Sequence, residues 1–552
     1  MNLLAVKARS VSKFLDTKAI LKHIVLTTFE TNKYYCMNTT STTNEFSLLG
    51  HKPALFVLFF TEIWERFSYY GMRAIFVLFL VKSWDWSNER AIGLLSIYTS
   101  TVYLTPIIGG FLADKFLGYQ KAIVFGAFAM TLGHVAMSLE TEMTLYIGIG
   151  LLIIGNGLFK PNVTSIISGL YDKYPERKDG AYTIFYMGVN AGGFLGVLLC
   201  GFLADNLSYS WGFGLAGIFM FLGTLQFWFG REIFENIGKS PSKKVDLSDA
   251  IEGIESTTNE IKKDEEVPAN VQRDRYIVVG LLAFFTVFFW AAFEQASGSM
   301  TIFASDYTQR TLEGNAATIF KIIDILVSTV PLIIISWVLL KLFGQTFKKI
   351  SLSNIVLGTS FICIWAIVIW KLSIIIPKEN AAIEASWFLI LNSLFIIFLA
   401  PLFSKWWESK YNPSAAVKFG IGMILLGVGF AALAYGSSTI PQGAKTASVS
   451  LIWLVIAYLL HTMGELCVSP VGLSYVSKLA PVKLVSLMFG IWFTANFFAN
   501  LLGGFTGSYI DPISEEYGLS TFFLIFTIIP IAAALIMLLL NPMLKRKMHG
   551  IE

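Results

Sequence analysis

Fourteen apolar segments, each about as long as a membrane-spanning helix, dominate the sequence. A transmembrane helix needs about 20 largely apolar residues to cross the hydrocarbon core of a bilayer. Because every backbone polar group must be satisfied inside that core, this many segments predict an all-α polytopic membrane protein. The segments are 53–82, 91–113, 119–139, 143–170, 180–204, 211–230, 275–304, 316–342, 350–373, 384–404, 418–436, 448–477, 484–507 and 519–541.

The composition agrees with a membrane protein. Of the 552 residues, 55% are hydrophobic and 14% are charged, whereas a soluble globular protein carries roughly 25% charged residues. The net charge of +4 is too small to indicate a nucleic-acid partner. Residues 1–50 have scattered basic residues and no unbroken apolar core of signal-peptide length, so we interpret them as a cytoplasmic extension, with Met37 as an alternative start.

The distribution of positive charges predicts the orientation. With the N-terminus in the cytoplasm, the inner connections hold 24 Lys and Arg residues and the outer connections hold six. Cytoplasmic loops carry the excess of Lys and Arg in membrane proteins. We therefore expect both termini to be cytoplasmic.

The order of segments predicts two helical bundles. Residues 51–230 hold six segments, 231–274 form a charged cytoplasmic linker, and 275–545 hold eight segments that include an extra pair at about 316–373. This layout, and the string GGFLADKFLGYQK at 109–121, resemble the major facilitator superfamily, whose halves are related by pseudo-symmetry. In that string we expect Gly110 to allow close helix approach, and the charged residues to bridge neighbouring helix ends.

The first segment carries ionisable residues on one face. Glu62, Glu65, Arg66, Tyr70 and Arg73 recur at helical spacing and form a continuous stripe with Tyr69. Ionisable residues within a membrane are costly and mark functional sites by default. Because acids and arginines share the face, the stripe fits a bundle interior.

Three further ionisable residues stand alone in apolar segments. Lys160, Glu294 and Glu465 have no opposite charge within one turn of their own helices. Each therefore needs a partner on another helix, a proton or a ligand. A purely structural set of interhelical ion pairs is the alternative, and charges on four different helices make it the weaker one.

These residues belong to motifs that resemble the proton-dependent oligopeptide transporter family. The first-segment pattern Glu-x-x-Glu-Arg, followed by Phe-x-Tyr-Tyr-Gly-Met-Arg, is similar to the first-helix motif of that family. Similar strings recur along both halves and cover about 53–541: GNGLFKPNVTSIISGLYD, FYMGVNAGGFLG, FWAAFEQ, APLF and GELCVSP. The resemblance implies a major facilitator fold, no cofactor or metal, and proton-coupled symport of di- and tripeptides into the cell across its plasma (inner) membrane.

The resemblance also implies residue roles in proton coupling. Glu62, Glu65 and Arg66 match the coupling motif, and Glu294 matches the seventh-helix carboxyl that takes the proton. We predict that Arg73 is the partner of Glu294. Some family members carry a histidine on the second helix, but here that position is Ser96, which excludes a histidine-based proton step there.

Eleven residues match peptide-binding positions. Arg73 and Lys160 match positives that receive the peptide carboxylate, Glu465 matches the acid that receives the α-amino group, and two asparagines match amides near the peptide backbone. The remaining matches are pocket-wall positions. The full set is Arg73, Tyr70, Tyr103, Lys160, Tyr186, Asn190, Trp290, Asn392, Glu465, Ser469 and Trp492.

Elementary chemistry supports the same assignment. Recognition of peptides of many sequences must hold their ends, with cations for the carboxylate, an anion for the amine and amides for the backbone. Arg73 and Lys160 lie in the first half and Glu465 lies in the second. A ligand held between them biases the movement of the halves against each other.

Several details depart from the family or stay open. Bacterial members usually carry an extra helix pair between the sixth and seventh helices, whereas here the pair follows Glu294, and Ser393 stands where the family often has proline. His461, one turn before Glu465, is either a packed or pore-facing neutral histidine or a partner that shares a proton with that acid. Lys321 and Asp324 are interpreted as a local structural pair.

Three other functions fit these residues less well. A family member for an amino acid, nitrate or peptide-like drug is possible, although nitrate has no use for Glu465. An antiporter-like subunit of a respiratory complex also carries membrane Lys and Glu, but the loop motif and the linker argue against it. An intramembrane enzyme is disfavoured by the five scattered histidines. We expect a carrier that works as a monomer, with peptide, protons and the lipid bilayer as its partners.

Overall fold

A computed structural model describes residues 46–240, 268–479 and 485–550. Residues 1–53 form a separate unit, of which the described part is a turn closed by backbone hydrogen bonds between Leu48 and His51. The rest of the chain from Ala54 onward is one unit built almost entirely of helices. The predicted all-α class is therefore confirmed.

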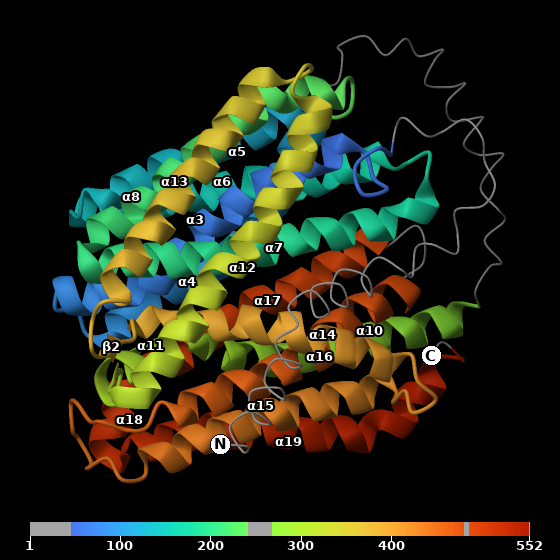
Figure 1. The fold of residues 1–552 in the computed structure, drawn as a ribbon. Coiled ribbons are helices and arrows are strands. Elements are labelled where there is room, and N and C mark those ends of the chain that lie inside the picture. Colours follow the sequence, from blue (N-terminus) through green and yellow to red (C-terminus); the bar gives the residue numbers. More distant parts are fainter. Residues whose placement is uncertain (1–45, 241–267, 480–484, 551–552) are drawn as a thin grey trace, which may run out of the picture. The chain divides into compact units, whose positions relative to one another are not determined.

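The six segments predicted before the linker are all helices (Figure 1). Proline, which lacks the N–H that a first helical residue leaves unpaired, begins the first of them. The helices are α3 (Pro53–Ser83), α4 (Asn88–Leu112), α5 (Tyr119–Ser138), α6 (Glu142–Leu170), α7 (Lys178–Asn206) and α8 (Tyr209–Gly230). Short turns extend them: η2 (Ala113–Leu117), η3 (Pro175–Arg177) and η4 (Arg231–Phe234).

The eight segments after the linker are also helical. The first begins at Ala269 rather than at residue 275, and residues 241–267 of the predicted linker lie outside the described residues. The long helices are α10 (Ala269–Phe293), α12 (Gly314–Thr346), α13 (Ser351–Ile375), α14 (Ile390–Trp407), α15 (Ala415–Ser437), α16 (Ile452–Leu479), α17 (Val485–Ser508) and α19 (Leu519–Lys547). Shorter elements are η5 (Glu294–Ser297), α11 (Ser299–Ile302), η6 (Phe303–Tyr307), η7 (Ala385–Leu389) and α18 (Ile510–Tyr517).

The lengths of these helices suit a bilayer. Twelve of the helices in the described residues are long and apolar enough to cross a membrane. Helix α3 differs from them because Glu62, Glu65, Arg66 and Arg73 lie within it, yet all four side chains are buried. Its charged face therefore points into the protein, as the stripe predicts.

The seventh membrane segment is not one continuous helix. Helix α10 ends at Phe293, and the four residues of η5 from Glu294 follow in a tighter 3₁₀ turn. Gly298 then interrupts the helix with φ −111° and ψ −103° before α11 begins. Glu294 thus lies at a helix break, where a side chain can be aimed independently of the helix below it.

The extra pair α12–α13 follows η6 and returns to α14 through a two-stranded sheet. Strands β1 (Thr311–Leu312) and β2 (Ala381–Ala382) pair antiparallel and tie the two connections together. Although the pair is inserted in the second half of the sequence, α13 packs on α8 of the first half. The Ser353 Oγ donates to the Gln226 carbonyl at 2.7 Å, and the Phe361 ring lies 5.7 Å from the Trp64 ring.

The predicted local pair of Lys321 and Asp324 is wrong. Asp324 forms a fully buried ion pair with Lys371 on α13 and accepts a hydrogen bond from the Trp387 indole at 3.2 Å. Lys321 donates to backbone carbonyls after α13, among them that of Lys378. A spacing of three residues would allow Lys321 to contact Asp324, but Asp324 instead pairs with the buried Lys371 on the neighbouring helix.

The loop motif also differs in detail from expectation. Gly109, not Gly110, makes the close helix contact, since a Cβ at Gly109 would overlap the Gly157 carbonyl of α6, whereas one at Gly110 would lie 3.9 Å from Pro161. Lys115 does not bridge helix ends but lies over the Phe111 ring, 4.6 Å from its centroid.

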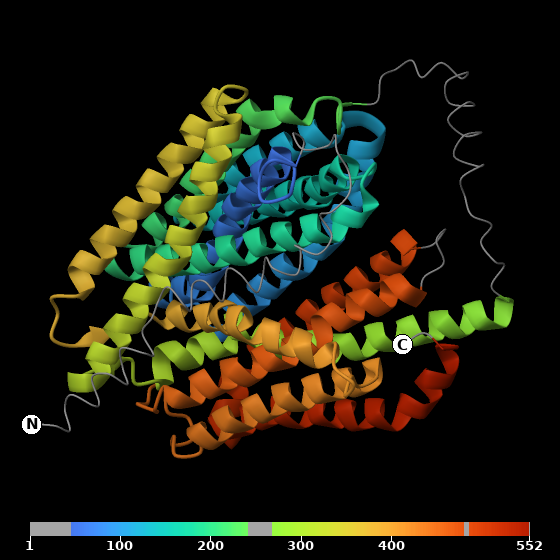
Figure 2. The ribbon, with the colours of Figure 1, turned by 45° about the vertical axis from the view of Figure 1, so that its right-hand side comes forward.

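The two ends of the bundle can be told apart by the linker. We call the end where α8 finishes and α10 starts the linker end, and the opposite end, with the α3–α4 and α7–α8 turns, the far end. Figure 2 shows the ribbons of the two halves close together at the far end and separated toward the linker end. At the far end the Asn88 amide donates to Asp511 at 2.8 Å, Lys82 pairs with Asp306, and the Ser96 hydroxyl donates to the Asn500 carbonyl at 2.9 Å.

Candidate functional site

A cavity of about 350 Å³ lies between the two halves. Such a volume is in the range of sites that bind small molecules. All eleven predicted peptide-binding residues line it, together with Arg66 and Glu294. The structure thus brings together residues from α3, α4, α6 and α7 of the first half and from α10, η5, α14, α16 and α17 of the second.

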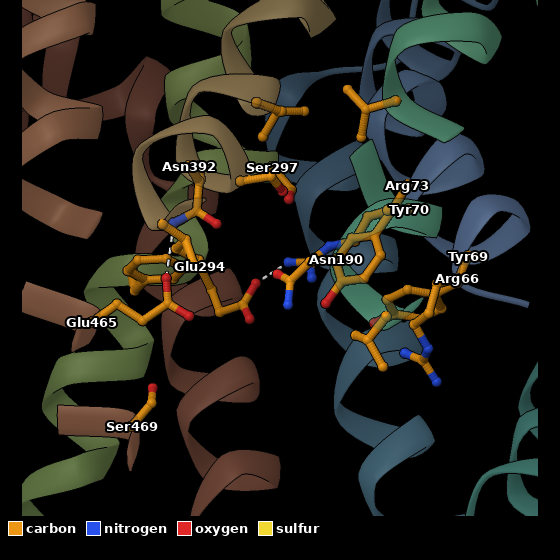
Figure 3. A pocket seen from close by; sticks show the side chains of 18 of the residues that line it. Arg66, Tyr69, Tyr70, Arg73, Asn190, Glu294, Ser297, Asn392, Glu465 and Ser469 are labelled. Carbon is orange, nitrogen blue, oxygen red and sulfur yellow. Dashed lines mark hydrogen bonds and ion pairs between the residues drawn. The ribbon is translucent and has the colours of Figure 1, made fainter. Parts of the chain in front are cut away.

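The walls of the cavity differ in charge. Figure 3 shows Arg66, Tyr70 and Arg73 of the first half on one side, and Glu294 and Glu465 of the second half on the other. Lys160 adds to the cationic wall. A ligand with separated negative and positive ends would match both walls.

An ion pair crosses the cavity between the halves. The Arg73 guanidinium contacts the Glu294 carboxylate, and both side chains are largely buried. The predicted partnership of these residues is present in the structure. A buried charge is strongly destabilised when its partner is removed, so each of these groups depends on the other in this state.

The coupling motif forms a compact cluster beside the cavity. The Arg66 Nε lies 2.9 Å from the Glu62 carboxylate and also pairs with Glu65. The Asn156 amide of α6 donates to Glu65 at 2.9 Å. Glu62 and Glu65 are buried behind Arg66 and are not among the residues that line the cavity. They therefore face another helix rather than a ligand in this conformation.

Glu465 is held by an amide instead of a cation. The Asn392 Nδ2 donates to Glu465 at 2.8 Å and also lies 3.2 Å from the Thr462 hydroxyl. Thr462 in turn donates to the Tyr458 carbonyl at 2.7 Å, which leaves its oxygen able to accept. The predicted amide and the predicted acid therefore form one unit, and no ion pair of Glu465 occurs among the described residues.

Lys160 also lacks a carboxylate partner within the described residues. Its Nζ lies 5.2 Å from the centroid of the Tyr103 ring, close enough for a cation–π contact. Proline at 161, inside α6, removes one backbone hydrogen bond near the lysine. The ammonium is thus positioned at the cavity with donors available to a ligand.

The other predicted residues differ in how firmly they are held. The Asn190 amide donates to the Tyr186 carbonyl one turn earlier, at 3.0 Å, so its oxygen is free to accept. Trp492 is buried against Phe419, with ring centroids 6.4 Å apart. The Ser469 hydroxyl is buried without a hydrogen-bond partner among the described residues, and Trp290 packs edge-on against Phe293.

His461 is a packed residue in this structure. Its ring lies 4.5 Å from the Phe430 ring, and its Nε2 has no hydrogen-bond partner in the described part of the chain. His461 also lines the cavity, so of the two alternatives the contacts support a packed, pore-facing histidine and not a proton shared with Glu465.

Sequence analysis missed several polar residues that line the cavity. Ser297, Tyr458 and Asn496 all reach it. Two more were noted in the sequence but not assigned to the cavity: Tyr69 as part of the stripe, and Ser393 as a departure from the family. Helical spacing was the available signal for two of them, since Tyr458 lies two turns before Glu465 and Asn496 lies one turn after Trp492. Ser297 carried the same kind of signal, because it lies three residues after Glu294 in the 3₁₀ turn η5.

Comparisons with known proteins agree with this site. The family model described as the POT family matches residues 120–373 and 356–523. An uncharacterised transporter, YclF of Bacillus subtilis, is 33% identical over 91% of this chain and 96% of its own length. The di-/tripeptide transporter of Lactococcus lactis subsp. cremoris is 32% identical over 91% of this chain and 97% of its own.

The fold of this chain also matches that of a solved peptide transporter. A crystal structure of a peptide transporter POT in complex with sulfate superposes with a TM-score of 0.69, at 27% identity, and the match covers 91% of this chain and 96% of that one. The family model spans parts of both halves, and the relatives cover about nine-tenths of this chain. The chain therefore belongs to the POT family, the proton-dependent oligopeptide transporters of the major facilitator superfamily.

Proposed function

We propose that this protein imports di- and tripeptides together with protons by alternating access. One observation carries the proposal: cations of the first half and Glu465 of the second face each other across a single cavity. A short peptide with a free carboxylate and a free amine has charges that match these two walls. Relatives described as di-/tripeptide transporters support the same substrate class.

The binding roles follow from the donors and acceptors that remain available. Arg73 and Lys160 bind the peptide carboxylate, and Glu465 with Asn392 binds the α-amine. Asn190 accepts from the peptide backbone, while the tyrosines and tryptophans pack against variable side chains. Because peptide ends and not side chains are held by charge, many sequences fit.

Proton coupling follows from the competition for Arg73. In this conformation its guanidinium is paired with Glu294. When a peptide carboxylate takes Arg73, Glu294 loses its partner, and a proton removes the charge that would otherwise be buried alone. Glu62, Glu65 and Arg66 link this exchange to the movement of α3 against its neighbours.

The conformation fits the inward-facing part of the cycle. The bias of Lys and Arg places the linker end in the cytoplasm, and the halves contact each other at the far end. The far end is then the external side, and both termini are cytoplasmic. We propose a monomer in the plasma membrane as the working unit.

A different small substrate is the alternative to peptides. An inorganic anion such as nitrate could use Arg73 and Lys160 but would leave Glu465 buried without a positive partner. An amino acid or peptide-like drug with both charges fits better. The zwitterionic peptide remains the substrate that uses both walls and both asparagine amides.

Uptake by the purified full-length chain in proteoliposomes tests the proposal. Labelled di- and tripeptides should accumulate above equilibrium when the external side is more acidic, and accumulation should stop when a protonophore is added. Concentrative uptake that persists with the protonophore would contradict proton symport. Concentrative uptake of labelled nitrate or of a single labelled amino acid, without uptake of labelled peptides, would contradict the peptide as the substrate.

A further inference from the structure

A second, smaller cavity lies directly beyond the Arg73–Glu294 pair, toward the far end. Its volume is about 20 Å³. Arg73 and Glu294 line both this cavity and the large one, so the ion pair separates the two. The other lining residues are Ile92, Leu95, Ser96, Thr99, Gln295, Gly298, Asn500, Gly503 and Gly504.

This small cavity, which we call the chamber, has the size and polarity that one buried water needs. A water requires roughly 10–15 Å³ and two to four polar partners. The Thr99 hydroxyl donates to the Leu95 carbonyl at 3.0 Å, and the Ser96 hydroxyl donates to Asn500, so both oxygens keep lone pairs for a water. The buried Arg73 Nε has no hydrogen-bond partner among the described residues and can donate to it.

The chamber is closed on the far side by tight packing. A Cβ at Gly504 would overlap the Ser96 side chain, so only glycine allows α17 to approach α4 this closely. The Gln295 amide donates to the Gly503 carbonyl at 2.7 Å and holds η5 against α17. Opening of the far end must separate α4 from α17 at the Ser96–Gly504 contact, whereas the Gln295–Gly503 bond lies within the second half, and that movement exposes Glu294 from the chamber side.

We propose that this chamber holds a water through which external protons reach Glu294, with Thr99 and Ser96 as positioning residues. The proposal rests on the proton-coupled function proposed above and adds a route to it. When the far end is open, a hydronium at this position gives its proton to the Glu294 carboxylate and remains as water. Arg73 and Glu294 are the titratable residues among the described residues that line the chamber, so no other side chain there competes for the proton.

Thr99→Val tests the proposal because valine keeps the shape of threonine and removes the oxygen. Gradient-driven peptide uptake should fall about fivefold to tenfold, as expected for one lost hydrogen bond on the proton route. Exchange of labelled for unlabelled peptide without a pH gradient should stay near the wild-type rate. Thr99→Ser, which keeps the hydroxyl, should restore gradient-driven uptake.

Thr101→Val is the matched control. Thr101 lies on the same helix and makes the same kind of bond, to the Ile97 carbonyl at 2.7 Å, but does not line the chamber. If Thr99→Val and Thr101→Val behave alike in gradient-driven uptake, the proposal is overturned. Equal loss of exchange and driven uptake in Thr99→Val would also overturn it, because that result indicates a structural role.

A peptide-free measurement separates this proposal from the transport function. After a drop in pH, infrared difference spectra of the reconstituted protein should show protonation of the carboxyl that is absent in Glu294→Gln. The rise of that band should be slower in Thr99→Val than in Thr101→Val. Equal rates would refute the route even if peptide uptake is proton-driven, whereas absence of peptide uptake by the unmodified protein would refute the transport function and leave this comparison valid.

Discussion

At the scale of single residues, the Arg73 guanidinium has two alternative partners, Glu294 and a carboxylate of a ligand. The two groups meet across the halves in this state. In the function that we propose, a carboxylate supplied by a ligand competes with Glu294 for Arg73, and the displaced acid is neutralised by a proton. Binding and protonation are therefore linked by a shared side chain and need no direct contact between peptide and proton.

Glu294→Gln and Arg73→Ala should have different effects. Glutamine resembles the neutral acid, so Glu294→Gln should abolish gradient-driven uptake while peptide binding and peptide exchange remain. Arg73→Ala removes a ligand for the peptide carboxylate and should impair uptake and exchange alike. Proteoliposome uptake with and without an imposed pH difference measures both. Accumulation by Glu294→Gln against a peptide gradient, driven by pH, would show that another group carries the proton.

Glu465 should be required for recognition of a free amine. Its carboxylate accepts from the Asn392 amide at 2.8 Å and faces the cavity without an ion-pair partner in the described residues. Glu465→Gln should weaken dipeptide binding by about 2–5 kcal/mol, the usual cost of removing one member of a buried charge pair. Binding of N-acetylated dipeptides, already weak, should change little. Equal affinity of the wild-type protein for free and acetylated dipeptides would argue against the role.

The sequence was sufficient to identify most of the site at this scale. Charged residues in apolar helices are conspicuous, and Lys160, Glu294 and Glu465 stood out for that reason. Side chains such as Ser297 were missed because an uncharged serine in an apolar segment does not stand out, although it lies three residues after Glu294 in the same turn. The hydrogen bond from Asn392 to Glu465 joins distant helices and required the fold.

At the scale of elements, the inserted pair α12–α13 belongs to one half by sequence and to the other by packing. Helix α13 contacts α8, Trp370 packs edge-on against Phe202 with ring centroids 5.2 Å apart, and Ser353 donates to Gln226. If the halves rock, the pair moves with the first half, and its connections at β1 and β2 must absorb the motion. The helices themselves were predictable from their apolar runs, but the surface they cover was not.

The buried Asp324–Lys371 pair should hold these two helices together. Lys371→Met alone leaves Asp324 charged and buried and should destabilise the protein by about 3–5 kcal/mol. Asp324→Asn combined with Lys371→Met removes both charges and keeps a carbonyl for the Trp387 indole, so much of that loss should be recovered. Thermal unfolding in detergent measures both, with Lys321→Met as a control for a half-buried lysine of the same helix pair that bonds backbone carbonyls and not a carboxylate in the described residues. A double variant no more stable than Lys371→Met would mean that the charges do not compensate each other.

At the scale of the whole transport unit, the polar contacts between the two halves lie at the far end and at mid-depth. Polar bonds join them at the far end, through Asn88 with Asp511 and through Ser96 with Asn500, and the Arg73–Glu294 pair joins them at mid-depth. The sequence predicted two bundles with a linker because its charges and apolar runs are local signals. Which end is closed is a difference between two conformations of the same sequence, and no local pattern encodes it.

A cross-link between the two halves at the far end should stop transport but should not prevent peptide from binding in the cavity. Asn88 and Asp511 are hydrogen-bonded at 2.8 Å between α4 and α18, so cysteines at both positions are within reach of a short bis-thiosulfonate reagent. The bridged Asn88→Cys/Asp511→Cys protein should lose peptide uptake, because alternating access requires the far end to open, and a reductant should restore uptake. Peptide binding to the bridged protein in detergent should persist, since the cavity keeps its access from the linker end. The single variants treated with the same reagent control for modification of native cysteines. Undiminished uptake by the bridged protein would show that the far end need not open, and the rocking movement inferred from the contacts would then be wrong.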